Sequence, residues 1–419
     1  MPKNNSNNKD NCSEVYSVFE HINDLKCLQP NIEAPIKRQP LSMATKAATV
    51  ARRWQAIDCE QAKSQILDQR TVETMDVYQK NIENFIGTVK LPVGIAGPLR
   101  VNGTFAQDDY FVPLATTEAA LVASYNRGAL LISEAGGCSA MLLNEGVCRT
   151  PGFAFNSLIE AGQFAAWATA QQDTFTQITE STSNHLTLKS FKINIEGNHV
   201  YLIFDYLTGD ASGQNMVTIA TNAALQYITE HSPCKAKHSF LDANLSGDKK
   251  ATLQSLNGVR GKKVTAEVHI SAELIKKRLH TTPELMSKFW RMSSIGGVLS
   301  GSVGVQGHYA NGLAAMYIAC GQDAACVAES AVGVTRMELA DDGGLYAAVT
   351  LPNLMVGTVG GGTGLPSQNA NLQILGLAGN GNAKALAEVC AGLCLAGELS
   401  IIGAFCAGHF AKAHHKLAR

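Results

Sequence analysis

Two stretches of the chain contain no Asp, Glu, Lys or Arg, and they constrain the fold more than any other feature. They span residues 292–322 and 343–383. Gly, Asn, Gln and Ser recur throughout both, and neither has the roughly 20 consecutive apolar residues that a membrane-spanning helix needs. We therefore predict that both stretches lie in the interior of a soluble protein with no membrane contact.

Size, charge and cysteine content place the chain among cytoplasmic globular proteins. Its 419 residues are 46% hydrophobic, which suffices for a large core divided over two or three domains. With 34 basic and 35 acidic residues it has no excess of positive charge with which to bind nucleic acid. Eleven scattered cysteines indicate reduced thiols. Cys390 and Cys394 lie one helical turn apart, which predicts packing and no metal site.

Local patterns predict a mixed α and β fold. Residues 1–80 alternate charged and apolar residues at helical spacing, which indicates a helical N-terminal region. Residues 83–101 contain Pro and Gly where a helix would be broken, so we predict extended backbone there. A turn at Asn102–Gly103 follows.

A different unit begins at Pro151. We predict a helix over residues 157–180 and strands over residues 186–195 and 199–207, joined by a Gly197–Asn198 turn. The next helix has five apolar residues on one face: Met216, Ile219, Ala220, Ala223 and Tyr227. A strand over residues 263–270 and two helices, the second beginning at Thr282–Pro283, complete this part of the chain.

The segment PLATTEAALVASYNR, residues 113–127, carries a candidate acid. Thr116 and Thr117 precede an Ala- and Leu-rich run with helical spacing, so we predict Glu118 in the first turn of a helix. One interpretation is a carboxylate that stabilises the helix N-terminus. The other is a general acid, because a carboxyl group surrounded by apolar residues has a raised pKa and holds its proton near neutral pH.

Two glycine-containing turns are candidate ligand sites. Residues 208–215, TGDASGQN, lie between a predicted strand and a predicted helix, where free backbone N–H groups and the helix dipole attract an anion. The sequence is not the dinucleotide fingerprint G-x-G-x-x-G, and a simple tight turn is the alternative. Residues 357–364, GTVGGGTG, contain five glycines in eight positions, so this backbone can lie against a pyrophosphate or a nicotinamide.

Other candidate groups lie in the second half of the chain. Residues 311–331 predict one helix of small apolar residues that contains Asp323. A buried carboxylate costs several kcal/mol unless it is paired, so Asp323 belongs either to a functional site or to a structural ion pair. Lys249, in the triplet Asp248–Lys250, and the terminal His409, His414 and His415 are by themselves typical of surface residues.

Taken together, these segments resemble the 3-hydroxy-3-methylglutaryl-CoA reductase family. The resemblance runs from about Glu83 to the C-terminus. It rests on ENFIG, PVGIAGPL, ATTEAALVAS, GDASGQN, DKK, YIACGQDAA, GTVGGGT and AGHFAKAH in this order, and the wording of the later motifs is similar to the eukaryotic-type class I enzymes. An ordered set of this length is very specific.

The resemblance implies a catalytic quartet of Glu118, Lys249, Asp323 and His414. Reduction of a thioester to an alcohol takes two hydride transfers with a hemithioacetal between them. Lys249 would stabilise the negative charge on the carbonyl oxygen, and His414 would protonate the leaving CoA thiolate. Glu118 would supply a proton to the aldehyde oxygen, and Asp323 would hold Lys249 and Glu118 in one proton-sharing network.

The resemblance also implies binding residues and an architecture. Substrate would contact Ser124, Arg149, Asn311 and Arg291, where Arg291 replaces an expected lysine whose position is occupied by Met292. A nicotinamide dinucleotide would contact Ser183, Asn184, Asp210, Gly213, Gln214, Asn215, Val359, Gly360 and Gly361. The implied fold is α+β, with a helical region over residues 1–80, a large substrate domain over residues 81–150 and 241–419, and an inserted, non-Rossmann cofactor domain over residues 151–240.

Several positions depart from the family pattern. Ser212 stands where methionine is usual, and His415 where methionine or leucine is usual. Asn184 replaces the arginine that holds the 2′-phosphate of NADPH, so NADPH is the expected cofactor with NADH as the alternative. We expect the protein to lack the regulatory C-terminal serine and the membrane anchor of eukaryotic relatives, and the resemblance implies a homodimer or homotetramer with active sites between subunits.

The leading hypothesis is therefore a cytoplasmic enzyme that reduces 3-hydroxy-3-methylglutaryl-CoA to mevalonate and CoA with two NAD(P)H. One alternative is the same reaction in the oxidative direction during mevalonate catabolism. A second is a catalytically silent CoA or dinucleotide sensor, and a third is a scaffold protein. Four intact acid, base and electrophile positions favour the enzyme, because a sensor does not need them.

Overall fold

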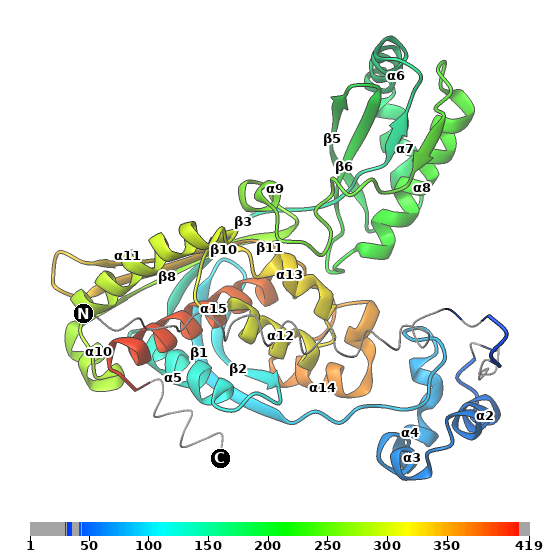
Figure 1. Cartoon of the computed structure of the whole chain (residues 1–419). Coiled ribbons are helices and arrows are strands. Elements are labelled where there is room, and N and C mark those ends of the chain that lie inside the picture. Colours follow the sequence, from blue (N-terminus) through cyan, green and yellow to red (C-terminus); the bar gives the residue numbers. More distant parts are fainter. Residues whose placement is uncertain (1–29, 31, 36–41, 43, 410–419) are drawn as a thin grey trace, which may run out of the picture. The chain divides into compact units, whose positions relative to one another are not determined.

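The computed structural model describes residues 30, 32–35, 42 and 44–409, and these divide into two compact units (Figure 1). Unit 1 comprises residues 1–88 and unit 2 residues 89–419. The predicted catalytic His414 and the neighbouring His415 lie outside the described residues.

Unit 1 is helical, as its spacing predicted. Its elements are α2 (Ala47–Ile57), α3 (Glu60–Ile66), α4 (Gln69–Glu73) and the 3₁₀ helix η2 (Met75–Tyr78). A small core of Val50, Trp54, Met75 and Phe85 holds them together. Arg53 is buried beside this core, and its Nη1 donates hydrogen bonds to the carbonyl oxygens of Ala44 and Phe85.

Unit 2 is built on one mixed sheet with helices packed on it, which confirms the mixed α and β content. Its strands are β1 (Val93–Gly103), β2 (Gln107–Ala115), β3 (Cys138–Arg149), β4 (Gly152–Ala154), β5 (Thr187–Glu196), β6 (His199–Leu207), β7 (His238–Phe240), β8 (Gly261–Ile270), β9 (Gly304–Val305), β10 (Gly333–Leu339) and β11 (Leu345–Leu354). The strand order is β7-β4-β6-β3-β8-β11-β10-β9; off this path, β1 pairs with β3, β2 pairs with β1, and β5 pairs with β6.

Helices and 3₁₀ turns connect these strands. They are α5 (Leu121–Glu134), α6 (Leu158–Ala170), α7 (Gln172–Glu180), α8 (Gln214–His231), α9 (Leu253–Asn257), α10 (Ala272–Leu279), α11 (Pro283–Ser300), α12 (Tyr309–Ala319), η3 (Ala324–Cys326), α13 (Val327–Ser330), η4 (Gly361–Gly364), α14 (Pro366–Ile374) and α15 (Ala383–Cys406).

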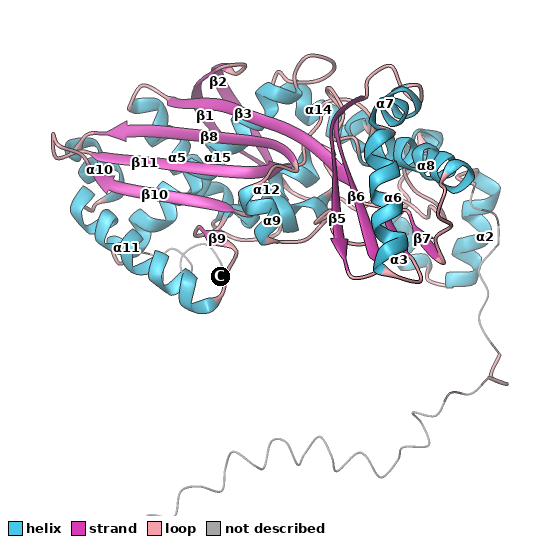
Figure 2. Cartoon of the chain, turned by 90° about the horizontal axis from the view of Figure 1, so that it is seen from above, coloured by secondary structure: helices cyan, strands magenta, loops and turns pink. Residues whose placement is uncertain are grey.

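Strand β3 joins two parts of the sheet. Its first residues pair with β1 and β8, whereas Val147–Arg149 pair with β6. Arg149 therefore stands where the β8 part of the sheet meets the hairpin of β5 and β6. The face of β8, β11 and β10 opposite helix α15 is free of helices in the view of Figure 2. Met141, on the neighbouring strand β3, is 53% exposed.

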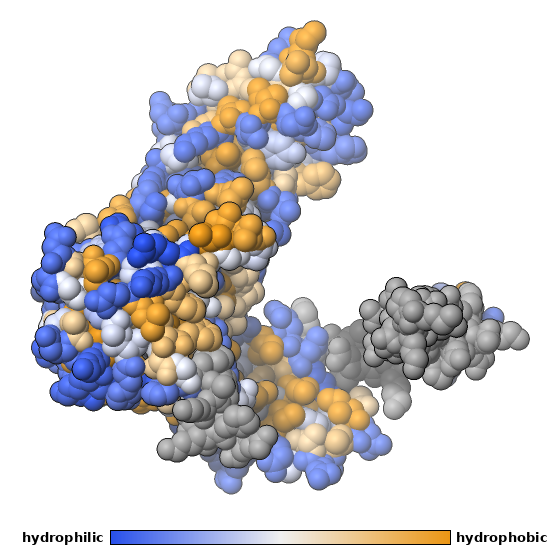
Figure 3. Space-filling model, turned by 60° about the vertical axis from the view of Figure 1, so that its left-hand side comes forward, coloured by the Kyte–Doolittle hydropathy of each residue, from blue (hydrophilic) through white to orange (hydrophobic). Residues whose placement is uncertain are grey.

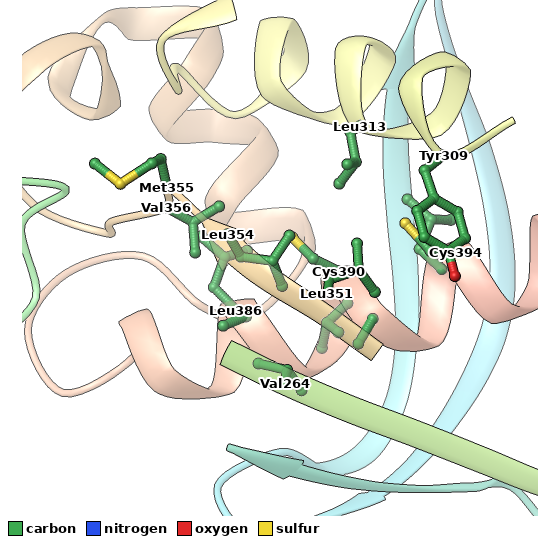
Figure 4. Close-up of a cluster of buried hydrophobic side chains, with 14 of the residues drawn as sticks. Val264, Tyr309, Leu313, Leu351, Leu354, Met355, Val356, Leu386, Cys390 and Cys394 are labelled. Carbon is green, nitrogen blue, oxygen red and sulfur yellow. The ribbon is translucent and has the colours of Figure 1, made fainter. Parts of the chain in front are cut away.

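Helix α15 forms the centre of the core. It packs on β1, β3, β8, β11, α5 and α12, and Figure 4 shows Leu386, Cys390 and Cys394 between Leu313 of α12 and Val264 of β8. The two cysteines are at most 1% exposed, which confirms their predicted packing role. Although α15 has the length and hydropathy of a membrane span, 83% of its apolar window is buried inside the protein.

Two carboxylates of α15 are buried although no sequence pattern singled them out. Glu388 is 0% exposed and accepts backbone N–H bonds from Phe105, Ala106 and Leu142. Glu398 is 1% exposed and accepts hydrogen bonds from the backbone of the segment before α12. Each carboxylate anchors an irregular backbone segment to the core helix.

Several predicted elements need correction. The segment predicted as one helix over residues 157–180 is α6 and α7, because the backbone at Gln171 leaves the helical conformation. The turn expected at Asn102–Gly103 lies at residues 104–106, since both predicted turn residues belong to β1. The hairpin of β5 and β6 and its Gly197 turn are confirmed.

The predicted apolar face of α8 is confirmed in part: Ala220 is buried, and Met216 and Tyr227 pack against the core. The residues that the helix buries are Val217, Ala220, Thr221, Ala224 and Ile228. Ile219, which belongs to the predicted face, is 61% exposed. The buried face therefore overlaps the predicted one and is rotated toward Val217, Thr221 and Ala224.

The charge-free stretch over residues 292–322 is not wholly interior. Its α12 part is buried, but Met292, Ile295, Val298 and Leu299 on α11 are 63–82% exposed. The second charge-free stretch holds the largely buried strand β11. The first stretch therefore begins with an apolar helix face that none of the described residues covers, which is typical of a contact surface.

Candidate active site

Glu118 and Asn311 form one side-chain pair. Asn311, in the first turn of α12, donates a hydrogen bond of 2.8 Å from Nδ2 to Oε2 of Glu118. They line a groove of about 400 Å³ whose apolar wall includes Leu91, Leu121 and Ile318. The groove therefore combines a carboxyl group, an amide donor and an apolar surface, as binding sites for small molecules do.

The predicted helical position of Glu118 was wrong. Helix α5 begins at Leu121, and Glu118 lies in the loop between β2 and α5. Ala120 has a φ of 67°, which interrupts the helix, and the Glu118 N–H bonds Thr116 Oγ1 in a local turn. Glu118 is exposed, so the described residues do not form the apolar enclosure expected around its carboxyl group.

Lys249 and Asp323 form a second pair. Lys249 Nζ lies 2.9 Å from Asp323 Oδ2, which confirms that Asp323 has a cationic partner. The hydrogen bond to Asp323 raises the pKa of Lys249 above its ordinary value. Asp323 also accepts the Ala325 N–H at 3.0 Å, so the start of η3 fixes its carboxylate.

The predicted burial of Asp323 was wrong. The expected helix over residues 311–331 is interrupted, because α12 ends at Ala319 and Asp323 lies in the following turn. Gly321 has a φ of 69°, and a Cβ atom there would lie 2.3 Å from the Gly362 carbonyl oxygen. This close approach ends the helix and leaves the Asp323 side chain 41% exposed.

The two pairs lie toward opposite ends of α12. Asn311 is in its first turn, and Asp323 follows its last residue, Ala319. The eight-residue separation of Asn311 and Ala319 corresponds to about 12 Å along a helix axis. No hydrogen bond or ion pair joins the two pairs within the described part of unit 2. A single chain therefore presents the predicted acid and the predicted lysine as separate half-sites.

A buried charge network lies behind Lys249. Arg149 Nη1 is 2.7 Å from Asp242 and 3.1 Å from Asp248. Arg260, only 2% exposed, contacts Asp248 at 2.9 Å and Glu329 at 2.5 Å. Sequence reasoning selected Arg149 but missed the other network members. Only Asp248 gave a signal, as the acidic residue of the SGDKK segment.

The two glycine-containing turns lie against each other. The N–H of Thr358 donates to the Asp210 carbonyl oxygen at 2.9 Å, and a Cβ atom on Gly357 would lie 2.5 Å from the Ser212 nitrogen. The Asp210 carboxylate accepts the N–H groups of Gly381 and Ala383 at the start of α15. Its side chain therefore holds the turn to the core helix.

The remaining predicted cofactor residues surround these turns. Ser183 and Asn184 lie in the loop between α7 and β5. His185, which follows Asn184 in this loop, lies near the first turn, because a Cβ atom on Gly209 would be 4.0 Å from the His185 carbonyl oxygen. Gly213, with a φ of 83°, precedes α8, and Asn215 is exposed in its first turn.

The glycine loop is open for ligand contact. Gly360 and Gly361 have φ values of 74° and 55°, and a Cβ atom at either would meet no atom within 4 Å. Val359 precedes them and is half-buried. Gln214 is engaged differently, because its amide bonds Arg149, Arg260 and Asp248.

Two predicted substrate residues lie on other helices. Ser124 of α5 contacts Ser400 of α15 through their hydroxyl oxygens at 2.9 Å, and Arg127 donates to the same hydroxyl. Arg291 is exposed on α11 next to Met292, which is 76% exposed. Neither Ser124 nor Arg291 is hydrogen-bonded to the two half-site pairs within the described residues.

Comparison with known proteins identifies the family. The model of the hydroxymethylglutaryl-coenzyme A reductase family matches residues 48–419. The 3-hydroxy-3-methylglutaryl-coenzyme A reductase of Pyrococcus horikoshii is 41% identical over 356 residues, which are 83% of this chain and 86% of that protein. The same enzyme of Methanothermobacter thermautotrophicus is 44% identical over 343 residues, which are 81% of this chain and 86% of that protein.

A solved structure shares the fold at lower sequence identity. The class II 3-hydroxy-3-methylglutaryl-CoA reductase of Streptococcus pneumoniae, solved bound to NADPH, aligns with a TM-score of 0.64 and 19% identity. The alignment covers 84% of this chain and 86% of that one. From the family model and the archaeal relatives together, the chain belongs to the hydroxymethylglutaryl-coenzyme A reductase family.

Proposed function

We propose that the chain reduces 3-hydroxy-3-methylglutaryl-CoA to mevalonate and CoA in an active site that two copies of the chain complete together. The activity follows from family membership. The observation that carries the site is the separation of the described quartet members: Lys249 and Asp323 pair with each other, whereas Glu118 pairs with Asn311. A silent sensor and a scaffold are not favoured, because neither needs an acid and a cation held in such pairs.

Lys249 is the electrophilic group of this site. Each hydride transfer places negative charge on the carbonyl oxygen of the substrate, and a positioned ammonium group stabilises that charge. The Asp323 carboxylate at 2.9 Å keeps Lys249 protonated and fixes the direction of Nζ. Lys249 therefore stays cationic throughout the neutral pH range.

Glu118 is the proton donor, and Asn311 orients it. The Asn311 amide donates to one carboxyl oxygen and leaves the other free to carry a proton. Enclosure of Glu118 by a second chain would supply the apolar surroundings that the described residues of one chain do not. His414 protonates the CoA thiolate in this proposal.

The two glycine-containing turns are the dinucleotide site. Gly360 and Gly361 expose backbone to a ligand, and the start of α8 supplies free N–H groups. A nicotinamide dinucleotide bound there supplies the hydride. NADPH is our first choice, with NADH as the alternative because Asn184 is neutral and exposed. No metal is required, since Lys249 stabilises the oxyanion. In this proposal residues 151–240 form the inserted cofactor domain between the two segments of the substrate domain, residues 81–150 and 241–419.

The exposed face of α11 supports an oligomer. Its apolar residues Met292, Ile295, Val298 and Leu299 follow one side of the helix, and Figure 3 shows apolar patches on the molecular surface. A second copy of the chain would cover this face and bring its own half-site to the first. We infer a homodimer or a tetramer of dimers, with Arg291 on the same helix near substrate. The free thiols of the described cysteines fit a reducing, cytoplasmic location.

The test is the loss of reduced-nicotinamide absorbance with 3-hydroxy-3-methylglutaryl-CoA, run in parallel with NADPH and NADH. We expect Lys249→Ala to lower kcat at least about 100-fold while CoA binding persists, because only the transition-state oxyanion contact is removed. Lys277→Ala, an exposed lysine of α10, is the matched control and should be unchanged. Equal turnover of Lys249→Ala and the wild-type protein would contradict the assignment.

A further inference from the structure

The backbone of Lys249 is held in an unusual conformation. Its φ is 56°, in the left-handed region that residues with side chains rarely adopt. Such a conformation is strained and persists only where the surroundings fix it. Some part of the structure must therefore hold this residue.

The group that holds it is a buried carboxylate. The Lys249 N–H donates to Oε1 of Glu329 at 3.3 Å. Glu329 is 0% exposed, and the same oxygen accepts Nη1 of Arg260 at 2.6 Å. Arg260 holds the Glu329 carboxylate in place, so Glu329 Oε1 stays within hydrogen-bond distance of the Lys249 N–H.

The pair also holds the residue before Lys249. Arg260 Nη2 lies 2.9 Å from Asp248 Oδ1 and donates to Gln214 Oε1 at 3.0 Å. One buried ion pair thus fixes the Asp248 side chain and the Lys249 backbone. Both attachments fix the backbone from which the Lys249 side chain reaches Asp323.

We propose that the buried ion pair of Arg260 and Glu329 is a positioning pair that sets the backbone of Lys249 and thereby aims its Nζ. The proposal rests on the function assigned to Lys249 above. Neither Arg260 nor Glu329 touches the reacting atoms, so both act through Lys249. A buried ion pair adds little net stability compared with apolar packing, and a geometric role accounts for keeping one here.

Two substitutions at Glu329 separate this role from a structural one. Glu329→Gln keeps an oxygen where the Lys249 N–H needs it but removes the negative charge beside Arg260. Glu329→Asp keeps the charge but withdraws the acceptor by one methylene. We expect Glu329→Asp to lose about tenfold in kcat with KM for both substrates within about twofold, and Glu329→Gln to lose at most about threefold.

The stability of the two variants should follow the opposite order. Glu329→Asp should unfold at the higher temperature, because Arg260 keeps a charged partner. A kcat that follows the stability order, or two folded variants with wild-type kcat, would overturn the proposal. If the Glu329 variants have the wild-type kcat while Lys249→Ala is inactive, the positioning proposal fails but the assignment of Lys249 stands. The failure of the proposal is therefore distinguishable from the failure of the proposed function.

A matched control is Glu388→Gln. Glu388 is equally buried and also accepts backbone N–H bonds, but it anchors Phe105 and Ala106 near the β1–β2 turn. The Glu388→Gln change should lower the unfolding temperature with no change in kcat of the folded enzyme.

If neither Glu329 variant folds, residue-resolved hydrogen exchange on the wild-type enzyme decides. A protected Lys249 amide supports the positioning role, and exchange at the rate of an unstructured chain overturns it.

Discussion

The two half-sites differ in how firmly the chain holds them. Lys249 is attached through Glu329, Asp248 and Arg260 to a network of buried charges, and Asp323 caps η3. Glu118 has Asn311 as its side-chain partner, in an exposed loop beside an apolar groove. Lys249 is thus held in place by residues of its own chain, whereas Glu118 is exposed and would be enclosed by a second chain in the proposed dimer. This difference is what an active site between subunits requires.

The largest expected effect is at the half-site of Lys249 and Asp323. Asp323→Asn removes the charge that holds Lys249, so we expect kcat to fall about 100-fold, or 2.7 kcal/mol. The Lys249 pKa, raised by the Asp323 hydrogen bond, should fall toward its ordinary value of 10.5. Any stability that this raised pKa provides is present below 10.5 and is lost as pH rises through the higher folded value.

The measurement is steady-state kinetics together with unfolding temperatures between pH 8 and 11, recorded for the wild-type enzyme and the variant. The difference in unfolding temperature should shrink at the alkaline end. A variant with wild-type kcat would show that Asp323 is an incidental surface partner of Lys249.

A second, smaller effect concerns stability. Burial by itself raises the pKa of Asp248, but the Arg260 and Arg149 guanidinium groups outweigh it and hold the pKa below the ordinary 3.8. Asp248 therefore adds stability above pH 3.8 that is lost as pH falls through its lower folded value. Asp248→Asn should lower the free energy of unfolding by about 1–3 kcal/mol at pH 7 and flatten its acid dependence.

Glu118→Gln sharpens the comparison at the other half-site. Because Glu118 is exposed, this change should alter the free energy of unfolding by less than about 0.5 kcal/mol. Urea unfolding of both variants at pH 7 and at pH 3 checks the pair, because the Asp248 contribution is lost below pH 3.8. Equal destabilisation by the two changes would show that the half-sites do not differ in how they are held.

The smallest expected effect on kcat is at Asn311. Asn311→Ala removes the donor that orients Glu118, and we expect about a tenfold loss in kcat, or 1.4 kcal/mol, since the acid itself remains. Ser367→Ala, in an exposed part of α14, is the control. A loss as large as that of Asp323→Asn would mean that Asn311 contacts the reacting atoms.

The sequence predicted the chemistry of the site better than its backbone. That Asp323 needs a cationic partner, and that Lys249 provides it, followed from charge and family pattern. The interruptions at Ala120 and Gly321 did not, because both depend on contacts or φ angles that the local pattern of apolar residues does not contain.

The rule that a carboxylate in an apolar helix needs partners was sound. It was applied to Asp323, however, and not to the carboxylates that are buried in the structure. It applies to Glu388 and Glu398, which lie in the alanine- and glycine-rich α15, and the same pattern could have found them. The pair of Arg260 and Glu329 left no such signal. These two residues are distant in sequence, and each stands in an ordinary local context.

The most direct test of the divided active site is complementation between two inactive chains. Glu118→Gln and Lys249→Ala proteins are each assayed alone, then unfolded and refolded together at equal concentrations. If each site takes its acid from one chain and its lysine from another, half of the dimers are mixed and carry one intact site. Activity should then recover to about a quarter of the wild-type value. A mixture as inactive as its two components would contradict an active site shared between chains.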